Sequence, residues 1–214
     1  MLNIKHIFKI GGLTFKGNKM DRRVKYTRMV LKESFIDLLE KKDVSRITVK
    51  EICENADINR ATFYAHYSDQ YDLLRKIEDE FVENIRAYLG ELNQKNDQVN
   101  SVLLAEKIFE YIKENAKLCK LLLSERGGLS FQKRVMMLVY DKIINELTYN
   151  SKITKEEAEY VYLFTITGCV GVVQKWLDED MKESAHYMAE MVIKLTMGLI
   201  NQLKGNDIFH RQSL

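Results

Sequence analysis

The residues best suited to a chemical role lie together in the segment NRATFYAHY, residues 59–67. Arginine can donate two hydrogen bonds to guanine, asparagine can pair with adenine, and alanine or threonine can contact the methyl group of thymine. Hydroxyl and imidazole groups can hold phosphates. The segment opens with residues of the first kind, Asn59, Arg60, Ala61 and Thr62, and continues with residues of the second kind, Tyr64, His66 and Tyr67. Both tyrosines could instead be core aromatics, and Tyr67 fits that alternative better.

Two helix starts position this segment. Thr48 and Glu51 have the spacing of a capping box, in which each side chain accepts a hydrogen bond from the other residue's backbone N–H. Asn59 is a preferred cap for a second helix that begins at about residue 60. The residues NADI between the two helices match the length of a helix-turn-helix joint. Thr48 and Lys50 lie at the start of the first helix, where N–H groups and the helix dipole favour an anion such as phosphate.

Catalytic chemistry has little support in the sequence. None of the four histidines has a cysteine or carboxylate at the spacing of a metal site or a catalytic triad. The three cysteines are far apart, which argues against a disulfide framework or a zinc site. The RGG at residues 126–128 lacks the lysine and the strand of a phosphate-binding loop. We therefore expect no metal, no cofactor and no enzymatic activity, and an enzyme on a helical scaffold is the third alternative.

The composition and the apolar spacing predict an all-α fold. The chain has 214 residues, 46% of them hydrophobic, and no proline, so long uninterrupted helices are permitted. Thr154 and Glu157 form a second capping box. A loop is expected over 90–100. The expected helices cover residues 24–42, short segments from about 49 and 60, a longer segment after Asp69, and then 101–123, 129–149, 155–178 and 184–204.

Charge divides the chain after Arg75. Residues 1–75 carry 15 Lys and Arg against 10 Asp and Glu, a net charge of +5, whereas the remainder carries 18 against 21, a net charge of −3. A basic first third suits a polyanionic partner. We expect a flexible extension at 1–21, a helix-turn-helix domain at 22–75, a helical domain at 76–205 and a tail at 206–214. Met20 could be a second start, and the first residues do not form a convincing signal peptide.

The segment ITVKEICENADINRATFYAHYSDQYDLL resembles the DNA-binding signature of the TetR family of transcriptional regulators, also called TetR/AcrR. That signature is T-x-x-x-I-x-x-x-A-x-[VI]-[SN]-x-x-T-x-Y-x-H-[FY], followed by a short link and paired leucines. Asp57 replaces the usual glycine, but Asp tolerates a left-handed turn better than most residues. Gln70 and Tyr71 replace the common lysine and acid. The matching residues are Thr48, Ile52, Ala56, Ile58, Asn59, Thr62, Tyr64, His66 and Tyr67, with Leu73 and Leu74 after them.

The resemblance covers residues 22–75 well, and residues 171–192 are more loosely similar to the C-terminal part of one TetR subgroup. It implies a dimer held by the last two helices and a ligand pocket in a helical C-terminal domain. An apolar stripe in the last helix could face a second subunit or the chain's own core: Met188, Met191, Val192, Leu195 and Leu199. Aromatic residues could line a pocket for an apolar or aromatic ligand, with core packing as the equal alternative: Phe109, Tyr111, Tyr140, Tyr162, Phe164 and Trp176.

The uncharged run from Tyr160 to Gln174 is shorter than the ~20 residues that span a bilayer, so we expect a packed helix there and no membrane partner. The predicted protein is a cytoplasmic, homodimeric transcriptional regulator, acting as a repressor, that binds a near-palindromic DNA operator and is released or modulated by a small-molecule ligand. The alternative is a TetR-like adaptor whose C-terminal domain binds a protein partner to control transcription.

Overall fold

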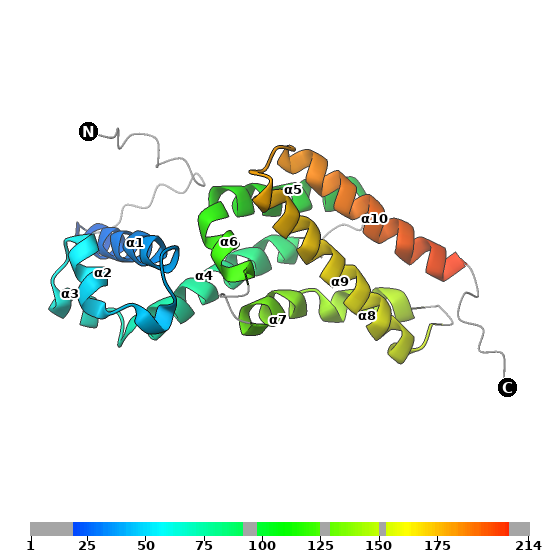
Figure 1. Cartoon of the computed structure of the whole chain (residues 1–214). Coiled ribbons are helices and arrows are strands. Elements are labelled where there is room, and N and C mark those ends of the chain that lie inside the picture. Colours follow the sequence, from blue (N-terminus) through cyan, green and yellow to red (C-terminus); the bar gives the residue numbers. More distant parts are fainter. Residues whose placement is uncertain (1–18, 92–97, 125–128, 150–152, 206–214) are drawn as a thin grey trace. The chain divides into compact units, whose positions relative to one another are not determined.

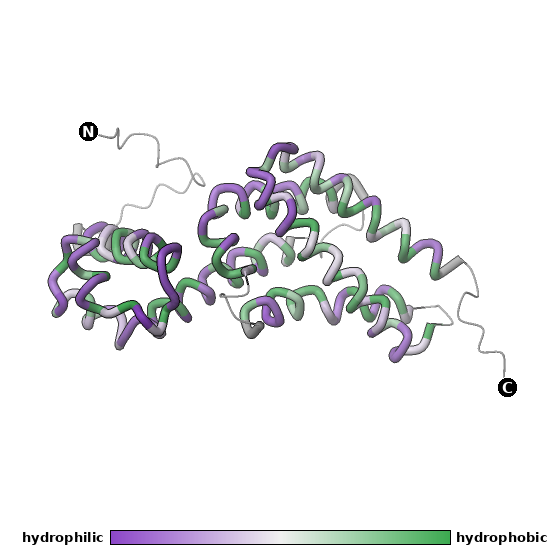
Figure 2. The backbone as a smooth tube through the Cα atoms, viewed as in Figure 1, coloured by the Kyte–Doolittle hydropathy of each residue, from purple (hydrophilic) through white to green (hydrophobic). Residues whose placement is uncertain are grey.

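The protein is all-α, as the sequence predicts. The computed structural model describes residues 19–91, 98–124, 129–149 and 153–205, and those ranges contain ten α-helices, one short 3-10 helix and no strand (Figure 1). The helices form two compact units that divide between Gln70 and Tyr71. Along them, hydrophobic and hydrophilic positions interleave at helical spacing (Figure 2). The predicted extension and tail lie outside the described ranges, except that residues 19–21 open the first helix.

The N-terminal unit is built on three helices and their caps. They are α1 (Lys19–Leu39), α2 (Val49–Ala56) and α3 (Arg60–Tyr64), and the 3-10 turn η2 (Val44–Arg46) precedes α2. The predicted capping box is present: Thr48 Oγ1 accepts from the Glu51 N–H at 3.3 Å, and Glu51 Oε2 accepts from the Thr48 N–H at 2.9 Å. α2 packs on α1 and α3. Their shared core is almost fully buried and includes Leu31, Phe35, Ile47, Ile52 and Phe63.

Acid should weaken the N-terminal unit through Glu51. Hydrogen bonds from the Lys42 side chain and then from the Thr48 backbone and hydroxyl lower the pKa of Glu51 from 4.5 to about 2. A carboxyl whose pKa is depressed by folding adds stability above its unfolded pKa, and this stability is lost as the pH falls through the folded pKa. We therefore expect the melting temperature to fall between pH 4.5 and about 2, and to fall less in Glu51→Gln.

The glutamine variant isolates the charge, because a glutamine carbonyl can still accept from the Thr48 N–H in a capping box. Thermal melts followed by circular dichroism, compared at each pH, remove the effect of the other carboxyl groups. Equal acid sensitivity of the two proteins would show that Glu51 does not stabilise the fold through its charge.

The C-terminal unit is a bundle of seven helices. They are α4 (Gln70–Glu91), α5 (Gln98–Glu114), α6 (Ala116–Leu123), α7 (Leu129–Met137), α8 (Tyr140–Thr148), α9 (Lys155–Asp178) and α10 (Ala185–Gly205). The second predicted capping box is also present, because Thr154 and Glu157 exchange hydrogen bonds at the start of α9. α10 runs along α5, and α9 contacts both α6 and α8. None of the helices, over the residues described, is long and apolar enough to cross a membrane.

One backbone carbonyl joins three of these helices. The amide nitrogens of Gln132 on α7 and Gln174 on α9 both donate to the carbonyl oxygen of Leu123, at 2.9 Å and 2.6 Å. Leu123 is the last residue of α6, where carbonyls have no partner within the helix. Two side chains from other helices therefore satisfy the open end of α6.

Three predicted boundaries are wrong. The helix expected over 101–123 is two helices, because the chain bends at Asn115, whose side chain donates to the Tyr111 carbonyl at 2.8 Å. The helix expected over 129–149 breaks at Val139, which has φ −111° and ψ 1° and no side-chain cap. The loop expected over 90–100 is shorter, since α4 continues to Glu91 and α5 begins at Gln98.

Candidate nucleic-acid interface

The turn between α2 and α3 has the geometry of a helix-turn-helix joint. Asp57 is left-handed, with φ 51° and ψ 43°, and its N–H donates to the last turn of α2. The Ile58 N–H donates to the Cys53 carbonyl at 2.9 Å, which closes the turn. Asn59 then caps α3 by accepting from the Ala61 N–H at 2.8 Å. An aspartate thus occupies the left-handed position that the resembling signature gives to glycine.

The start of α3 presents the predicted base-reading residues. Arg60 and Ala61 are exposed and Thr62 is half-buried. Asn59 is also exposed, but its Oδ1 already accepts the capping hydrogen bond. The pairing of asparagine with adenine uses both the oxygen and the nitrogen of the amide. If Asn59 made that pair, its Oδ1 would have to accept from adenine as well as from the Ala61 N–H. Arg60 is therefore the strongest candidate for contact with a base.

The predicted phosphate-binding residues divide between surface and core. Thr48 and Lys50 are exposed, Tyr64 is 57% exposed, and His66 is half-buried. Tyr67 is only 5% exposed, and its ring packs against Phe63 with centroids 5.5 Å apart. The structure thus favours the alternative in which Tyr67 is a core aromatic, because a side chain so enclosed cannot reach a phosphate without leaving its packing.

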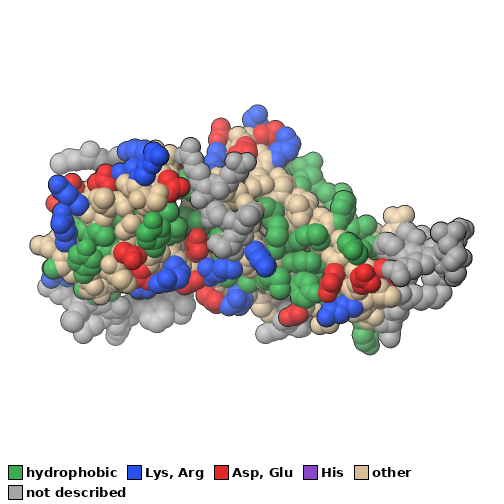
Figure 3. All heavy atoms as spheres, turned by 60° about the horizontal axis from the view of Figure 1, so that its bottom comes forward, with side chains coloured by type: hydrophobic (Ala, Val, Ile, Leu, Met, Phe, Trp, Pro, Cys, Tyr) green, Lys and Arg blue, Asp and Glu red, His purple; other side chains and the backbone are tan. Residues whose placement is uncertain are grey.

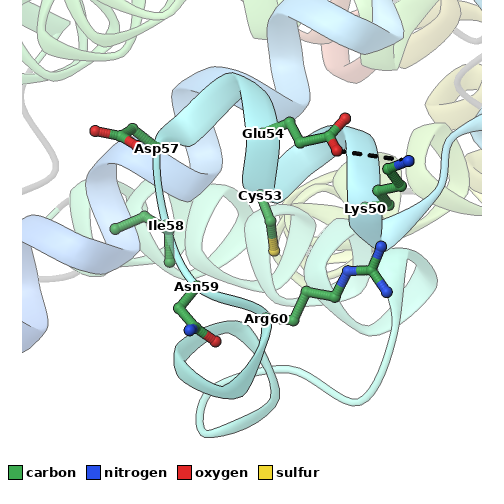
Figure 4. A pocket seen from close by; sticks show the side chains of 7 residues that line it. All are labelled: Lys50, Cys53, Glu54, Asp57, Ile58, Asn59 and Arg60. Atoms are coloured by element: carbon green, nitrogen blue, oxygen red, sulfur yellow. Dashed lines mark ion pairs between the residues drawn. The ribbon is translucent and has the colours of Figure 1, made fainter.

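A shallow depression of about 520 Å³ lies between α2 and the start of α3 (Figure 4). Within it, Lys50 Nζ is 3.7 Å from Glu54 Oε1. Burial raises the pKa of the Cys53 thiol, and the Arg60 guanidinium opposes that shift only in part. No group of three or more metal-binding side chains occurs in the described part of the chain. The lining residues are Lys50, Cys53, Glu54, Asp57, Ile58, Asn59 and Arg60.

The aromatic residues predicted for a ligand pocket do not lie in one place. Phe109 and Trp176 pack edge to face with centroids 5.3 Å apart, and the Trp176 indole donates to the Glu183 carbonyl at 3.0 Å. Tyr140 and Tyr162 form a second such pair at 5.0 Å. The remaining two lie apart from these pairs: the Tyr111 hydroxyl accepts from Asn84 at 2.9 Å, and Phe164 is 74% exposed.

The predicted dimer residues of α10 differ in exposure. Met188 is buried within the chain at 4% exposure, whereas Leu195 is 64% exposed. Leu199 packs beside the cluster formed by α8, α9 and α10. Met191 and Val192 are half-buried.

The uncharged run from Tyr160 to Gln174 gives α9 an exposed apolar face. Tyr160, Leu163 and Phe164 are 70%, 56% and 74% exposed, and Gly168 and Gly171 continue the same face at helical spacing. A Cβ added at either glycine would meet no atom within 4 Å. Figure 3 shows hydrophobic side chains gathered on the surface of the C-terminal unit. The absence of charge from Tyr160 to Gln174 fits a helix that is apolar on two faces.

Known proteins match the chain as follows. The family model of the TetR C-terminal region, described as a transcriptional regulator C-terminal region, matches residues 100–198. An uncharacterized HTH-type transcriptional regulator of Haemophilus influenzae is 24% identical over 188 residues, which cover 85% of this chain and 92% of that protein. The uncharacterized HTH-type transcriptional regulator YxbF of Bacillus subtilis is 44% identical over 61 residues, 28% of this chain and 16% of that protein.

A solved TetR transcriptional regulator from Streptococcus agalactiae shares the fold. Its TM-score is 0.58 at 20% sequence identity, and the alignment covers 83% of this chain and 97% of that one. The described helices accordingly have the arrangement of such regulators, with an N-terminal helix-turn-helix followed by a helical C-terminal domain. The matching C-terminal region, the helix-turn-helix relatives and the common fold together make the chain similar to TetR-family transcriptional regulators.

Proposed function

We propose that the protein is a homodimeric repressor whose two helix-turn-helix units bind successive major grooves of a near-palindromic operator. The observation that carries this proposal is the exposed start of α3, where Arg60 and Ala61 project beyond the Asn59 cap. A short helix of this kind can enter a major groove, and half-sites in dimeric complexes lie one helical turn, ~34 Å, apart.

The exposed face of α9 supports the dimer. A large apolar surface on a soluble monomer normally marks an interaction site. Gly168 and Gly171 have open space around them, so packing within this chain does not account for their lack of side chains. Their exposed position allows the backbone of a second copy to approach closely. The dimer would then bury three apolar side chains against the partner's apolar face and remove them from water: Tyr160, Leu163 and Phe164.

The interior of the C-terminal unit supports control by a small molecule. Thr165 on α9 is 8% exposed, and its Oγ1 has no hydrogen-bond partner among the described residues. An unsatisfied buried hydroxyl costs about 1–3 kcal/mol, which a ligand with one polar group could recover. The neighbouring pair Tyr140 and Tyr162 would face the apolar part of that ligand. The ligand releases DNA only if it binds the two conformations of the dimer with different affinity.

Capture of genomic DNA tests this function. Purified protein is mixed with sheared genomic fragments, and the retained fragments are sequenced and confirmed by gel shift. We expect a shared near-palindromic sequence, and we expect compounds that raise the melting temperature to change its retention. If no fragment is retained until a second protein is added, the adaptor alternative holds and the repressor proposal is wrong.

A further inference from the structure

The recognition side of the N-terminal unit is close to electrically neutral. The depression beside α3 contains the cations Lys50 and Arg60 and the carboxylates Glu54 and Asp57. Lys50 is already paired with Glu54, and both side chains are more than half exposed. Non-specific binding to DNA depends almost entirely on cations that neutralise phosphates. This side of the unit therefore supplies little of that attraction.

The first described turns of α1 carry the positive charge that the recognition side lacks. Arg22, Lys25 and Arg28 are all exposed and recur every three residues. Their side chains lie along one side of the helix, and the fully buried Leu31 and Phe35 belong to its later turns. Within the described residues, none of the three cations is paired with a carboxylate.

We propose that this basic face of α1, made by Arg22, Lys25 and Arg28, binds phosphates of the DNA backbone flanking the groove that α3 enters. The inference rests on the proposed operator binding and extends it. It assigns base recognition to α3 and most of the phosphate attraction of the unit to α1. The two surfaces belong to one compact unit, in which α1 packs on α2 and α2 packs on α3 (Figure 1).

Charge complementarity favours duplex DNA as the partner that binds the basic face of α1. B-DNA carries one negative charge per ~1.7 Å of helix axis, so a row of cations with the reach of arginine and lysine side chains meets several phosphates. Unpaired cations also bind without first breaking an ion pair, whereas Lys50 must leave Glu54. Exposed ammonium and guanidinium groups suit this role, because they can bind phosphates of any sequence. Such phosphate contacts fix the position of a protein on DNA but do not distinguish one base from another.

The test is the salt dependence of DNA affinity. The triple variant Arg22→Gln, Lys25→Gln and Arg28→Gln keeps helix-forming side chains and removes three charges. Binding to operator and to scrambled duplex is measured by fluorescence anisotropy between 50 and 200 mM salt. Each phosphate contact contributes about 0.9 to the slope of log K against log salt, so over this range the wild-type protein should lose about 40-fold more affinity for each bound half-site than the triple variant. The base preference of the variant should be unchanged.

The matched control removes three exposed lysines from the C-terminal unit, Lys113→Gln, Lys133→Gln and Lys155→Gln, and gives the same change in net charge. It should keep the wild-type slope. Equal slopes for the α1 triple variant and this control would overturn the inference, provided that both are folded by circular dichroism. Failure of the wild-type protein to bind any duplex at 50 mM salt is a different result, because it would reject the proposed operator binding itself. Loss of binding to anionic phospholipid vesicles with an unchanged DNA slope would also overturn the inference, since it would assign the face to a membrane surface.

Discussion

Phe164→Glu should convert the protein from a dimer of about 50 kDa, twice the chain mass of 25.1 kDa, into a monomer. Phe164 is 74% exposed in the middle of the apolar face of α9. A glutamate there would have to be buried without a partner in each subunit of a dimer, which costs several kcal/mol per charge. Because the side chain is exposed in the single chain, the change should leave the monomer folded.

Tyr149→Glu is the matched control for this prediction. Tyr149 is 73% exposed but follows the end of α8, off the α9 face, so its replacement should leave the dimer intact. Light scattering at micromolar concentration distinguishes the two species. The dimer interface assigned to α9 would be wrong if Phe164→Glu kept the mass of a dimer, or if the wild-type protein were already monomeric.

Arg60→Ala should cost about 1–3 kcal/mol of binding free energy on the operator and relax the preference at one base pair in each half-site. The reason is that Arg60 is exposed at the first position of α3 and can donate two hydrogen bonds to a guanine. Affinity for scrambled duplex should change much less, because the loss there is that of a single cation.

Tyr64→Phe and Lys50→Ala are the comparisons that separate base recognition from phosphate contact. Tyr64 is 57% exposed and its ring lies edge on to Phe63, so phenylalanine keeps the packing and removes only the hydroxyl. Both variants should weaken operator and scrambled duplex about equally, and Lys50→Ala should also reduce the salt slope by about one contact per half-site. These roles would be reversed if Arg60→Ala weakened both duplexes alike while Tyr64→Phe changed base preference.

The parts of the fold predicted from sequence are those determined by local hydrogen bonds. Thr48 with Glu51 and Thr154 with Glu157 satisfy helix N–H groups through neighbours three residues away, so their spacing alone locates the starts of α2 and α9. The break at Asn115 is accompanied by a local hydrogen bond from its side chain to the Tyr111 carbonyl, which also accepts from the Asn115 N–H. Asparagine is tolerated inside helices, so the pattern did not reveal this break.

The parts of the site that could not be predicted depend on whether a side chain points into the core or toward solvent. Tyr64 and Tyr67 have the same chemistry and lie three residues apart, yet one is mostly exposed and the other is packed on Phe63. The stripe of α10 has the same ambiguity, because apolar periodicity indicates burial without saying whether the cover is the same chain or another one. Met188 is covered by its own chain, whereas Leu195 is open.

The two hydrogen bonds to the Leu123 carbonyl restrict which ligands the C-terminal core could accept. A ligand that moves α7 or α9 away from the end of α6 would leave the side-chain amide of Gln132 or Gln174 without its hydrogen-bond acceptor. Each such amide costs about 1–3 kcal/mol unless the ligand offers an acceptor in place of the carbonyl. A saturated hydrocarbon has none, while a molecule with two suitably spaced oxygens can take over both donors. Under the proposed control by a small molecule, the end of α6 would therefore favour, among ligands of equal size, those that carry such oxygen atoms.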